Sequence, residues 1–162
     1  MNTKKITQHE LTSYVSKISR DIILSEWKPD LIVGLTRGGL IPAVMLSHYF
    51  NIPMKALHVA LRDFPDTCSD LDLADQTYAG LKVLIVDDIN DTGATFKWIL
   101  NDWRSSAYPD DDKWNTIWHD NVRFAVIADN YNSNFRVNYA GFNFDKSITD
   151  IWFEFPYDHW WI

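Results

Sequence analysis

The hydrophobic positions of the 162-residue chain follow a helical period near the N-terminus. Apolar side chains there share one helical face: Leu11, Tyr14, Val15, Ile18, Ile22 and Ile23. Thr7 and Glu10 have the spacing of a capping box, in which two side chains bond the free amides at the start of a helix. We therefore expect a first helix that begins after Thr7 and ends near Pro29.

Farther along the chain, four short apolar runs have the length and composition of buried strands. They cover residues 30–35, 54–61, 82–86 and 123–129. Apolar stretches of helical length follow the first run, over 40–50, and the third, over about 92–103. Strands that alternate with helices form right-handed crossovers and a parallel sheet. The pattern predicts an α/β fold, a single domain over 1–162 with a mostly parallel twisted sheet flanked by helices.

A long polar connection separates the second and third predicted strands. It covers about residues 59–80 and carries five aspartates, Asp63, Asp66, Asp70, Asp72 and Asp75. A connection of this length without secondary structure of its own is usually functional or disordered. We therefore expect a flexible loop with a functional role.

Composition and charge exclude several classes of protein. The formal net charge of −7 argues against nucleic-acid binding, because such proteins carry a basic face that displaces phosphate counterions. No apolar run approaches the roughly 20 residues that span a bilayer, so we expect no membrane association. Cys68 is the single cysteine, and the N-terminus does not have the pattern of a secretory signal. We therefore expect a cytoplasmic protein without disulfides.

The stretch "VDDINDTGAT" ends the third predicted strand with an unusual group of acids. Asp87 and Asp88 come directly after the apolar run, and Asp91 precedes a turn of small residues. Such carboxylates can bind hydroxyl groups or Mg²⁺, and the amides at a helix N-terminus can bind a phosphate. A second glycine turn, "TRGG", follows the first strand. Because ligands bind at the carboxyl ends of parallel strands, both turns should face one pocket, which suits a sugar phosphate.

The longer stretch "VLIVDDINDTGAT" closely resembles the phosphoribosyl-pyrophosphate (PRPP) binding motif of type I phosphoribosyltransferases. The order of elements and the segment "DIWFEFPYD" are similar to those of bacterial xanthine-guanine phosphoribosyltransferases, which hold the purine with residues equivalent to 150–162. The resemblance implies the type I phosphoribosyltransferase fold, with residues 59–80 as a flexible hood loop. It also implies transfer of the 5-phosphoribosyl group from PRPP to guanine, xanthine or hypoxanthine in purine salvage, giving a nucleoside monophosphate and pyrophosphate.

The resemblance also implies a role for each residue that matches the family motifs. The residues that would bind PRPP are Thr36, Arg37, Gly38, Gly39, Asp87, Asp88, Thr92, Gly93, Ala94 and Thr95. Asp91 would be catalytic, relaying a proton at the purine imidazole nitrogen, and Asp87 and Asp88 would also bind Mg²⁺. Trp152 would stack on the base and Phe153 would offer backbone contacts. The resemblance further implies a non-proline cis peptide in the "TRGG" loop and a homo-oligomer, either a dimer or a tetramer.

One position departs from the family pattern. Relatives that use 6-oxopurines usually place a lysine just after the fourth strand, where this chain has Asp129 and Asn130 and no lysine between Lys113 and Lys146. We assign Asp129 to base binding, although a carboxylate accepts hydrogen bonds where lysine donates them. The base therefore stays open, and a phosphoribosyltransferase for another base is one alternative.

Functions of another class also stay open. A non-catalytic or regulatory relative that binds PRPP or a nucleotide would explain the missing lysine and the acidic hood loop. The aromatic residues Trp160 and Trp161 at the end of the chain are assigned to packing or oligomer contacts. The chain is too short for PRPP synthetase, which needs a second similar domain, and no G-x-G-x-x-G follows a strand to indicate a dinucleotide site.

Overall fold

The computed structural model of the chain describes residues 1–61, 66–67, 70–106 and 111–162. Within these ranges the elements are, in order, β1 (Asn2–Lys5), α1 (Gln8–Leu24), β2 (Leu31–Thr36), α2 (Leu40–Phe50), β3 (Met54–Ala60), β4 (Asp66–Thr67), α3 (Leu71–Tyr78), β5 (Val83–Asn90), α4 (Ala94–Ser106), α5 (Trp114–Ile117), β6 (Val122–Asn130), β7 (Tyr139–Phe144) and β8 (Ile151–Glu154).

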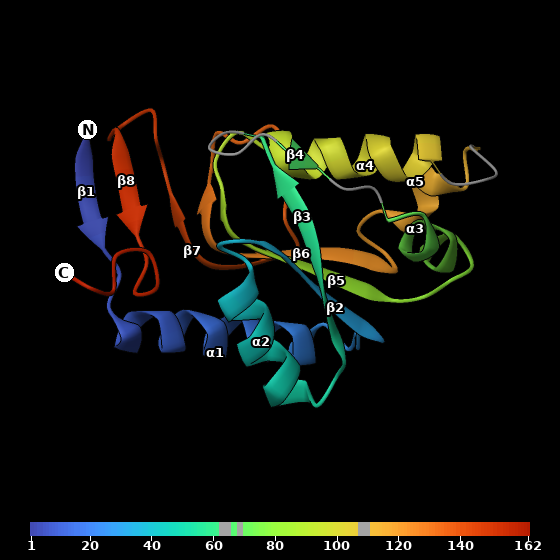
Figure 1. The fold of residues 1–162 in the computed structure, drawn as a ribbon, viewed down its shortest axis with the longest axis horizontal. Helices are drawn as coiled ribbons and strands as arrows, with labels where there is room; N and C mark the ends of the chain where they lie inside the picture. Colours follow the sequence, from blue (N-terminus) through green and yellow to red (C-terminus); the bar gives the residue numbers. More distant parts are fainter. Residues whose placement is uncertain (62–65, 68–69, 107–110) are drawn as a thin grey trace.

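Six of the strands form one sheet in the order β4-β3-β2-β5-β6-β7. All neighbouring pairs are parallel except β3 and β4, which are antiparallel. Figure 1 shows α1 and α2 on one face of the sheet and α3, α4 and α5 on the other. The predicted α/β architecture, with a mostly parallel sheet flanked by helices, is therefore confirmed.

The central strand β5 shows why its sequence is a continuous apolar run. Leu84 and Val86 belong to the core under α1 and α2, whereas Val83 and Ile85 belong to the core under α3, α4 and α5. A parallel strand covered on both faces needs apolar side chains at every position. Burial of each such side chain stabilises the fold by roughly 1.5–3 kcal/mol. The first polar residue after these four, Asp87, therefore marks the edge of the buried sheet.

Helix α1 begins as its sequence predicts. The N–H of Glu10 donates to Thr7 Oγ1 at 3.1 Å, and the N–H of Thr7 donates to Glu10 Oε2 at 2.8 Å. The buried face matches the helical pattern except at its end, where Ile23 is 53% exposed. The helix ends at Leu24, well before Pro29.

The connection over 59–80 is more ordered than expected. Strand β3 continues to Ala60, and α3 covers Leu71–Tyr78. Asp70 begins this helix by accepting a hydrogen bond from the N–H of Leu73 at 2.9 Å, and it forms an ion pair with Lys55. The expectation of a loop without secondary structure was wrong for this part. The expected flexibility concerned residues that include 62–65 and 68–69, which lie outside the described residues.

Strands β1 and β8 form a separate two-stranded parallel sheet. The N–H of Asn2 donates to the carbonyl of Asp150 at 3.0 Å, and the N–H of Ile6 donates to that of Glu154 at 2.8 Å. Both chain ends lie beside this sheet (Figure 1). The N-terminal residues thus support the segment to which the sequence assigns base binding.

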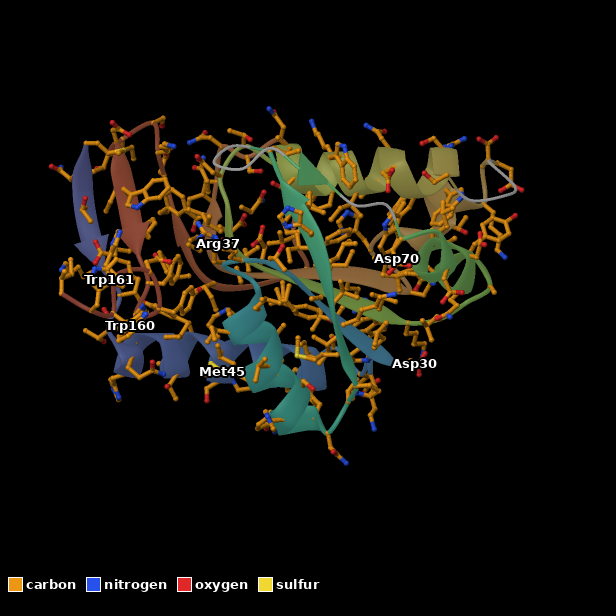
Figure 2. The ribbon with its side chains drawn as sticks, in the orientation of Figure 1. Asp30, Arg37, Met45, Asp70, Trp160 and Trp161 are labelled. Carbon is orange, nitrogen blue, oxygen red and sulfur yellow. The ribbon has the colours of Figure 1, made fainter. Side chains whose placement is uncertain are left out.

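The last residues of the chain lie on the surface near this small sheet. Trp160 is 77% exposed and Trp161 is 63% exposed, and both lie at the β1/β8 end of the molecule (Figure 2). Packing against the core of their own chain therefore does not account for these side chains. Oligomer contact stays a prediction for them. Within the described ranges, no helix is both long and apolar enough to cross a membrane.

The capping box predicts a measurable contribution to stability. Replacing Thr7 by Ala removes the acceptor for the N–H of Glu10 and should lower the free energy of unfolding by about 1 kcal/mol. Urea denaturation followed by circular dichroism measures this change. The matched control is Ser16→Ala at an exposed position inside α1, which should leave stability unchanged or slightly higher because alanine favours helices. Equal loss in both variants would contradict the capping role.

Candidate functional site

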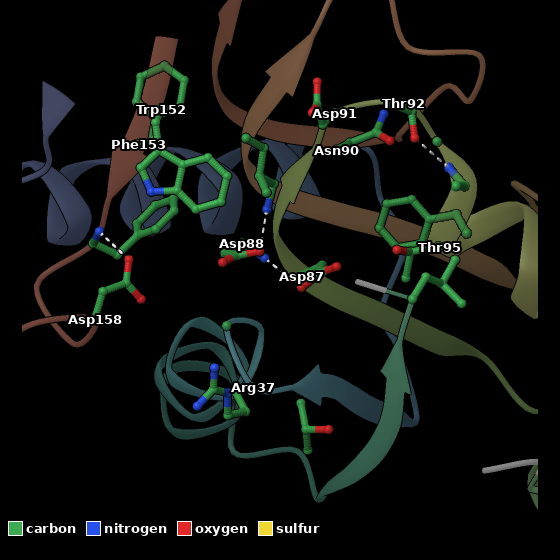
Figure 3. Close-up of a pocket in the computed structure, with 18 of the residues that line it drawn as sticks. Arg37, Asp87, Asp88, Asn90, Asp91, Thr92, Thr95, Trp152, Phe153 and Asp158 are labelled. Carbon is green, nitrogen blue, oxygen red and sulfur yellow. Dashed lines mark hydrogen bonds between the residues drawn. The ribbon is translucent and has the colours of Figure 1, made fainter. Parts of the chain in front are cut away.

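A cavity of about 670 Å³ lies at the carboxyl ends of β2 and β5 and is bounded on one side by the C-terminal segment. Figure 3 shows Trp152 and Phe153 at one side of it and Thr92 and Thr95 at the other, with Asp87 and Asp88 between them. The two glycine turns therefore face one pocket, as the parallel topology predicts. Of the predicted site residues, all line this cavity except Gly39 and Asp129.

Asp87 and Asp88 lie near the end of β5, which continues to Asn90 rather than ending at Val86. The strand continues because it keeps its pairing with β6 through Asp87 and Asn90. The N–H of Asp88 donates to Asp87 Oδ1 at 2.9 Å, and the N–H of Ile89 donates to Asp88 Oδ1 at 2.8 Å. Each carboxylate is thus held by a backbone amide through one of its oxygens.

Ionisation of both carboxyl groups of this pair is unfavourable without a cation. Burial raises the pKa of Asp87 well above its ordinary value, and the neighbouring charge of Asp88 raises it further. Burial also raises the pKa of Asp88, and the charge of Asp158 acts in the same direction. Burial and like charge both disfavour the ionised form of a carboxyl group. A bound cation would reverse this effect.

The donor set of the pair fits Mg²⁺. Mg²⁺ usually binds through one or two carboxylates and completes its shell with waters and phosphate oxygens of the ligand. Among the residues that the structure describes, no cluster of three or more acidic, histidine or cysteine side chains forms a site made by protein alone. Asp87 and Asp88 could therefore hold Mg²⁺ together with a phosphorylated ligand.

The turn after β5 places backbone amides beside these acids. Gly93 has a φ of +89°, and a Cβ there would lie 2.7 Å from Phe135 Cβ, so the turn requires glycine. The N–H of Asn134 donates to the carbonyl of Thr92 at 3.1 Å and holds the turn from the other side. Helix α4 begins at Ala94, and the first amides of a helix have no intrahelical acceptor. This arrangement suits a phosphate group.

The "TRGG" turn approaches the acids from β2. A Cβ on Gly38 would lie 2.1 Å from Asp88 Oδ2, so a larger residue here would require the Asp88 side chain to move. Gly39 does not line the cavity, and it begins α2 where a Cβ would lie 2.3 Å from the carbonyl oxygen of Val86. The peptide bond between Thr36 and Arg37 is cis, which confirms that expectation.

Asp91 is held by residues that sequence reasoning did not connect to it. Lys146 Nζ lies 2.7 Å from Asp91 Oδ2, and Asn130 Nδ2 donates to the Asp91 carbonyl at 3.0 Å. Asn130 Oδ1 also accepts from the N–H of Lys146 at 3.2 Å. The ends of β6 and the connection after β7 thus meet at Asp91. The sequence pattern did not reveal β7, so nothing indicated that Lys146 would return to this site.

The C-terminal segment forms the other side of the cavity. Trp152 is 47% exposed and lines the cavity, so its ring is available to a ligand. Phe153 is buried between Phe142 and Phe144, at ring-centroid distances of 5.1 and 4.9 Å. Backbone contact is therefore the interaction that Phe153 can offer to a ligand.

Asp129 is placed differently from the prediction. Its carboxylate accepts a hydrogen bond from Asn90 Nδ2 at 2.8 Å, and Asn90 also donates to the carbonyl of Phe135 at 2.9 Å. Burial raises the pKa of Asp129, although the bond from Asn90 opposes this. Asn90 lines the cavity, whereas Asp129 does not. The carboxylate of Asp129 therefore orients the Asn90 side chain and does not face the cavity itself.

Two residues of the cavity that form hydrogen bonds with the "TRGG" loop, His58 and Tyr157, were missed. His58 comes from β3, and its Nδ1 lies 2.5 Å from Thr36 Oγ1. Tyr157 follows β8, and its hydroxyl lies 3.0 Å from the carbonyl oxygen of Gly38. His58 follows an apolar strand residue, so its position near a strand end was a usable signal. Tyr157 lies within the segment assigned to base binding, but its contact with a loop 119 residues away has no signal in the sequence.

Comparison with known proteins gives the fold a family. The profile of the family described as phosphoribosyl transferase domain matches residues 2–159. A purine phosphoribosyltransferase from Pyrococcus horikoshii superposes with a TM-score of 0.69 at 25% identity, covering 98% of this chain and 95% of that one. No curated protein sequence matches the chain significantly.

Two other solved structures share the fold at lower identity. The xanthine-guanine-hypoxanthine phosphoribosyltransferase of Helicobacter pylori has a TM-score of 0.66 at 15% identity and covers 97% of this chain and 94% of that one. A hypothetical protein from Neisseria gonorrhoeae, solved with bound ppGpp, has a TM-score of 0.68 at 19% identity and covers 97% and 89%. The chain belongs to the phosphoribosyl transferase domain family, which confirms the type I phosphoribosyltransferase fold and the enzyme class expected from its sequence.

Proposed function

We propose that the protein transfers the 5-phosphoribosyl group from PRPP to a purine base, with guanine, xanthine or hypoxanthine as acceptor, and releases pyrophosphate. The observation that carries this proposal is the order of groups along one cavity. A phosphate-binding turn, two adjacent carboxylates and an exposed tryptophan ring succeed one another across it (Figure 3). The purine enzyme from Pyrococcus horikoshii, which covers nearly the whole chain, supports a purine as acceptor.

At the PRPP end, each group of residues has a distinct role in the proposal. The turn over Thr92, Gly93, Ala94 and Thr95 binds the 5-phosphate through its amides. Asp87 and Asp88 bind the ribose hydroxyls and Mg²⁺, which would neutralise charge on the pyrophosphate when bound. The loop of Thr36, Arg37, Gly38 and Gly39 binds the pyrophosphate, with the Arg37 guanidinium stabilising charge on the leaving group.

At the base end, we assign the proton transfer to Asp91. The bond from the ribose to pyrophosphate breaks as the bond to the base nitrogen forms, so the ribose carbon gains positive character between these groups. The Asp91 carboxylate takes the proton that the imidazole nitrogen of the base must lose. Lys146 keeps this carboxylate oriented through their 2.7 Å ion pair. Trp152 stacks on the base, and Phe153 contacts it through its backbone.

The setting of the reaction belongs to the same proposal. A cytoplasmic role in purine salvage fits an enzyme that joins a free base to PRPP. We also propose a homo-oligomer, a dimer or a tetramer, because the exposed rings of Trp160 and Trp161 suit contact with a second copy. Light scattering after size-exclusion chromatography measures the oligomeric state directly.

The decisive experiment is a panel of acceptors. The protein is incubated with PRPP, Mg²⁺ and each of guanine, xanthine, hypoxanthine, adenine, orotate and uracil, and nucleotide and pyrophosphate are measured. Product with a 6-oxopurine supports the proposal. Product only with another base would show that this base, and not a 6-oxopurine, is the acceptor. No product with any base would contradict transfer and favour a non-catalytic nucleotide-binding relative. Calorimetric titration with PRPP and with ppGpp, the ligand named for the Neisseria protein, would then follow.

Asp91→Asn should separate turnover from binding. The amide keeps the size of the side chain but cannot accept the proton, so kcat should fall about 100-fold or more. The Kd for PRPP should stay within about twofold, because the proposal assigns Asp91 to the base and not to PRPP. The control is Asp112→Asn, which removes an exposed carboxylate paired with Arg104. Unchanged kcat in Asp91→Asn would show that this residue is not the proton acceptor.

Asp87→Asn should stabilise the free protein while weakening PRPP binding. The pKa of Asp87 is raised on folding, so the folded state binds its proton more tightly than the unfolded state and loses stability as pH rises through that pKa. An uncharged residue removes this loss. Urea denaturation from pH 5 to 8 should show a higher free energy of unfolding at pH 7 and a flatter pH dependence.

Asp87→Asn should also change how Mg²⁺ affects the binding of PRPP. Calorimetry with PRPP should show that Mg²⁺ no longer improves affinity in Asp87→Asn. Asp112→Asn again provides the control, because its exposed carboxylate lies outside the cavity. Wild-type affinity together with an unchanged dependence on Mg²⁺ would refute the metal assignment.

A further inference from the structure

Tyr157 connects two parts of the cavity that the proposed function assigns to different ligands. Its hydroxyl donates to the carbonyl oxygen of Gly38 at 3.0 Å, and its ring stacks on Phe155 with centroids 5.6 Å apart and an interplanar angle of 5°. Gly38 belongs to the "TRGG" loop, whereas Tyr157 belongs to the segment that carries Trp152. The contact therefore joins the loop side to the tryptophan side directly.

On the tryptophan side, a tight turn fixes the position of Tyr157. Asp158 Oδ2 accepts a hydrogen bond from the N–H of Phe155 at 2.7 Å, and the N–H of Asp158 donates to the carbonyl of Phe155 at 3.0 Å. Phe155 itself is only 3% exposed and belongs to the core under α1 and α2. The phenol ring is thus anchored to the same buried layer that supports β8.

On the loop side, the peptide unit between Gly38 and Gly39 is held at both of its polar atoms. Its carbonyl accepts from Tyr157, and its N–H donates to the carbonyl of Leu35 at 2.9 Å. A peptide group fixed in this way has one orientation, and it fixes the amides beside it. Because Gly38 also lies against Asp88, the orientation of this peptide unit determines how the loop faces the carboxylate pair.

The chemistry of the two groups also determines which of them donates the hydrogen bond. A carbonyl oxygen can only accept, so the phenol must keep its proton to make the bond. Burial raises the pKa of Tyr157, and the charges of Asp88, Asp158 and Asp87 act in the same direction. The hydroxyl therefore keeps its proton more firmly than a free phenol and can act as the donor.

We infer that Tyr157 is a positioning residue that couples occupancy of the Trp152 side of the cavity to the geometry of the "TRGG" loop. A ligand that orders the C-terminal segment then orders the loop through the Tyr157–Gly38 hydrogen bond and raises the affinity for a pyrophosphate group. The reverse holds equally, since coupling between two sites is reciprocal. The identity of the two ligands rests on the proposed function, but the contact itself does not.

Tyr157→Phe tests this inference because it removes one hydroxyl and leaves the stacked ring. The matched control is Tyr139→Phe, whose buried hydroxyl contacts Ser25 Oγ at 2.8 Å and Arg123 Nη1 at 2.9 Å and does not line the cavity. In the free protein, amide hydrogen exchange over residues 36–42 should become about fivefold faster in Tyr157→Phe, the ratio expected for one lost hydrogen bond. It should stay at the wild-type rate in Tyr139→Phe.

The ligand experiment measures the coupling. Calorimetry determines the Kd of inorganic pyrophosphate with Mg²⁺, first alone and then with saturating GMP as the probe of the tryptophan side. GMP should lower this Kd severalfold in the wild type and in Tyr139→Phe, and the ratio should approach one in Tyr157→Phe. Equal ratios in the wild type and Tyr157→Phe would overturn the inference, and so would unchanged exchange over residues 36–42.

These outcomes separate the inference from the proposed function. If no base is a substrate but exchange over 36–42 rises in Tyr157→Phe alone, the transfer reaction is wrong and the role of Tyr157 in the loop is supported. If a base is a substrate and both measurements are unchanged, the reaction stands and the inference fails. Loss of folding is excluded by comparing the urea denaturation curves of the two phenylalanine variants.

Discussion

The site depends on one electrostatic constraint, the placement of two neighbouring, half-buried carboxylates at the end of a central strand. Burial raises the pKa of both Asp87 and Asp88, so their ionised forms are disfavoured at the point where β5 leaves the apolar core. The surrounding backbone is arranged accordingly. Gly38 brings a loop against Asp88, and the amide of Ile89 bonds one of its oxygens. A cation is the natural complement to this arrangement, because it neutralises the charge that the fold concentrates there and can also bind the phosphate oxygens of a ligand.

The elements that sequence predicted correctly share a local cause. The apolar run of β5 and the capping box of α1 are set by residues that lie within a few positions of one another. Strand β1 has no such signal, since all four of its residues are exposed and its order comes from pairing with β8, about 150 residues away in the chain. Helix α3 was hidden for another reason. Its two leading aspartates resemble loop composition, although Asp70 is the residue that begins the helix.

The same distinction explains the site. The acids and the phosphate turn are contiguous in sequence, so their chemistry could be predicted together. Lys146, His58 and Tyr157 reach the site only through the tertiary fold, from positions 55, 22 and 119 residues away from their partners. The prediction that Asp129 binds the base did not anticipate Asn90, whose side-chain amide donates a hydrogen bond to the Asp129 carboxylate. A residue at the end of a strand can face the ligand or a neighbouring strand, and sequence alone does not decide between them.

The surroundings of Asp91 contain a lysine that comes from an unexpected part of the chain. The strand end where the sequence resemblance led us to expect a lysine holds Asp129 and Asn130, and the ammonium of Lys146 lies 2.7 Å from the Asp91 carboxylate. It comes from the connection after β7, and Asn130 itself binds the backbone N–H of Lys146 as well as the carbonyl of Asp91. The asparagine thus orients both members of the Asp91–Lys146 ion pair. A lysine from a different element is therefore paired with Asp91, in an arrangement that the sequence pattern around Asp129 did not indicate.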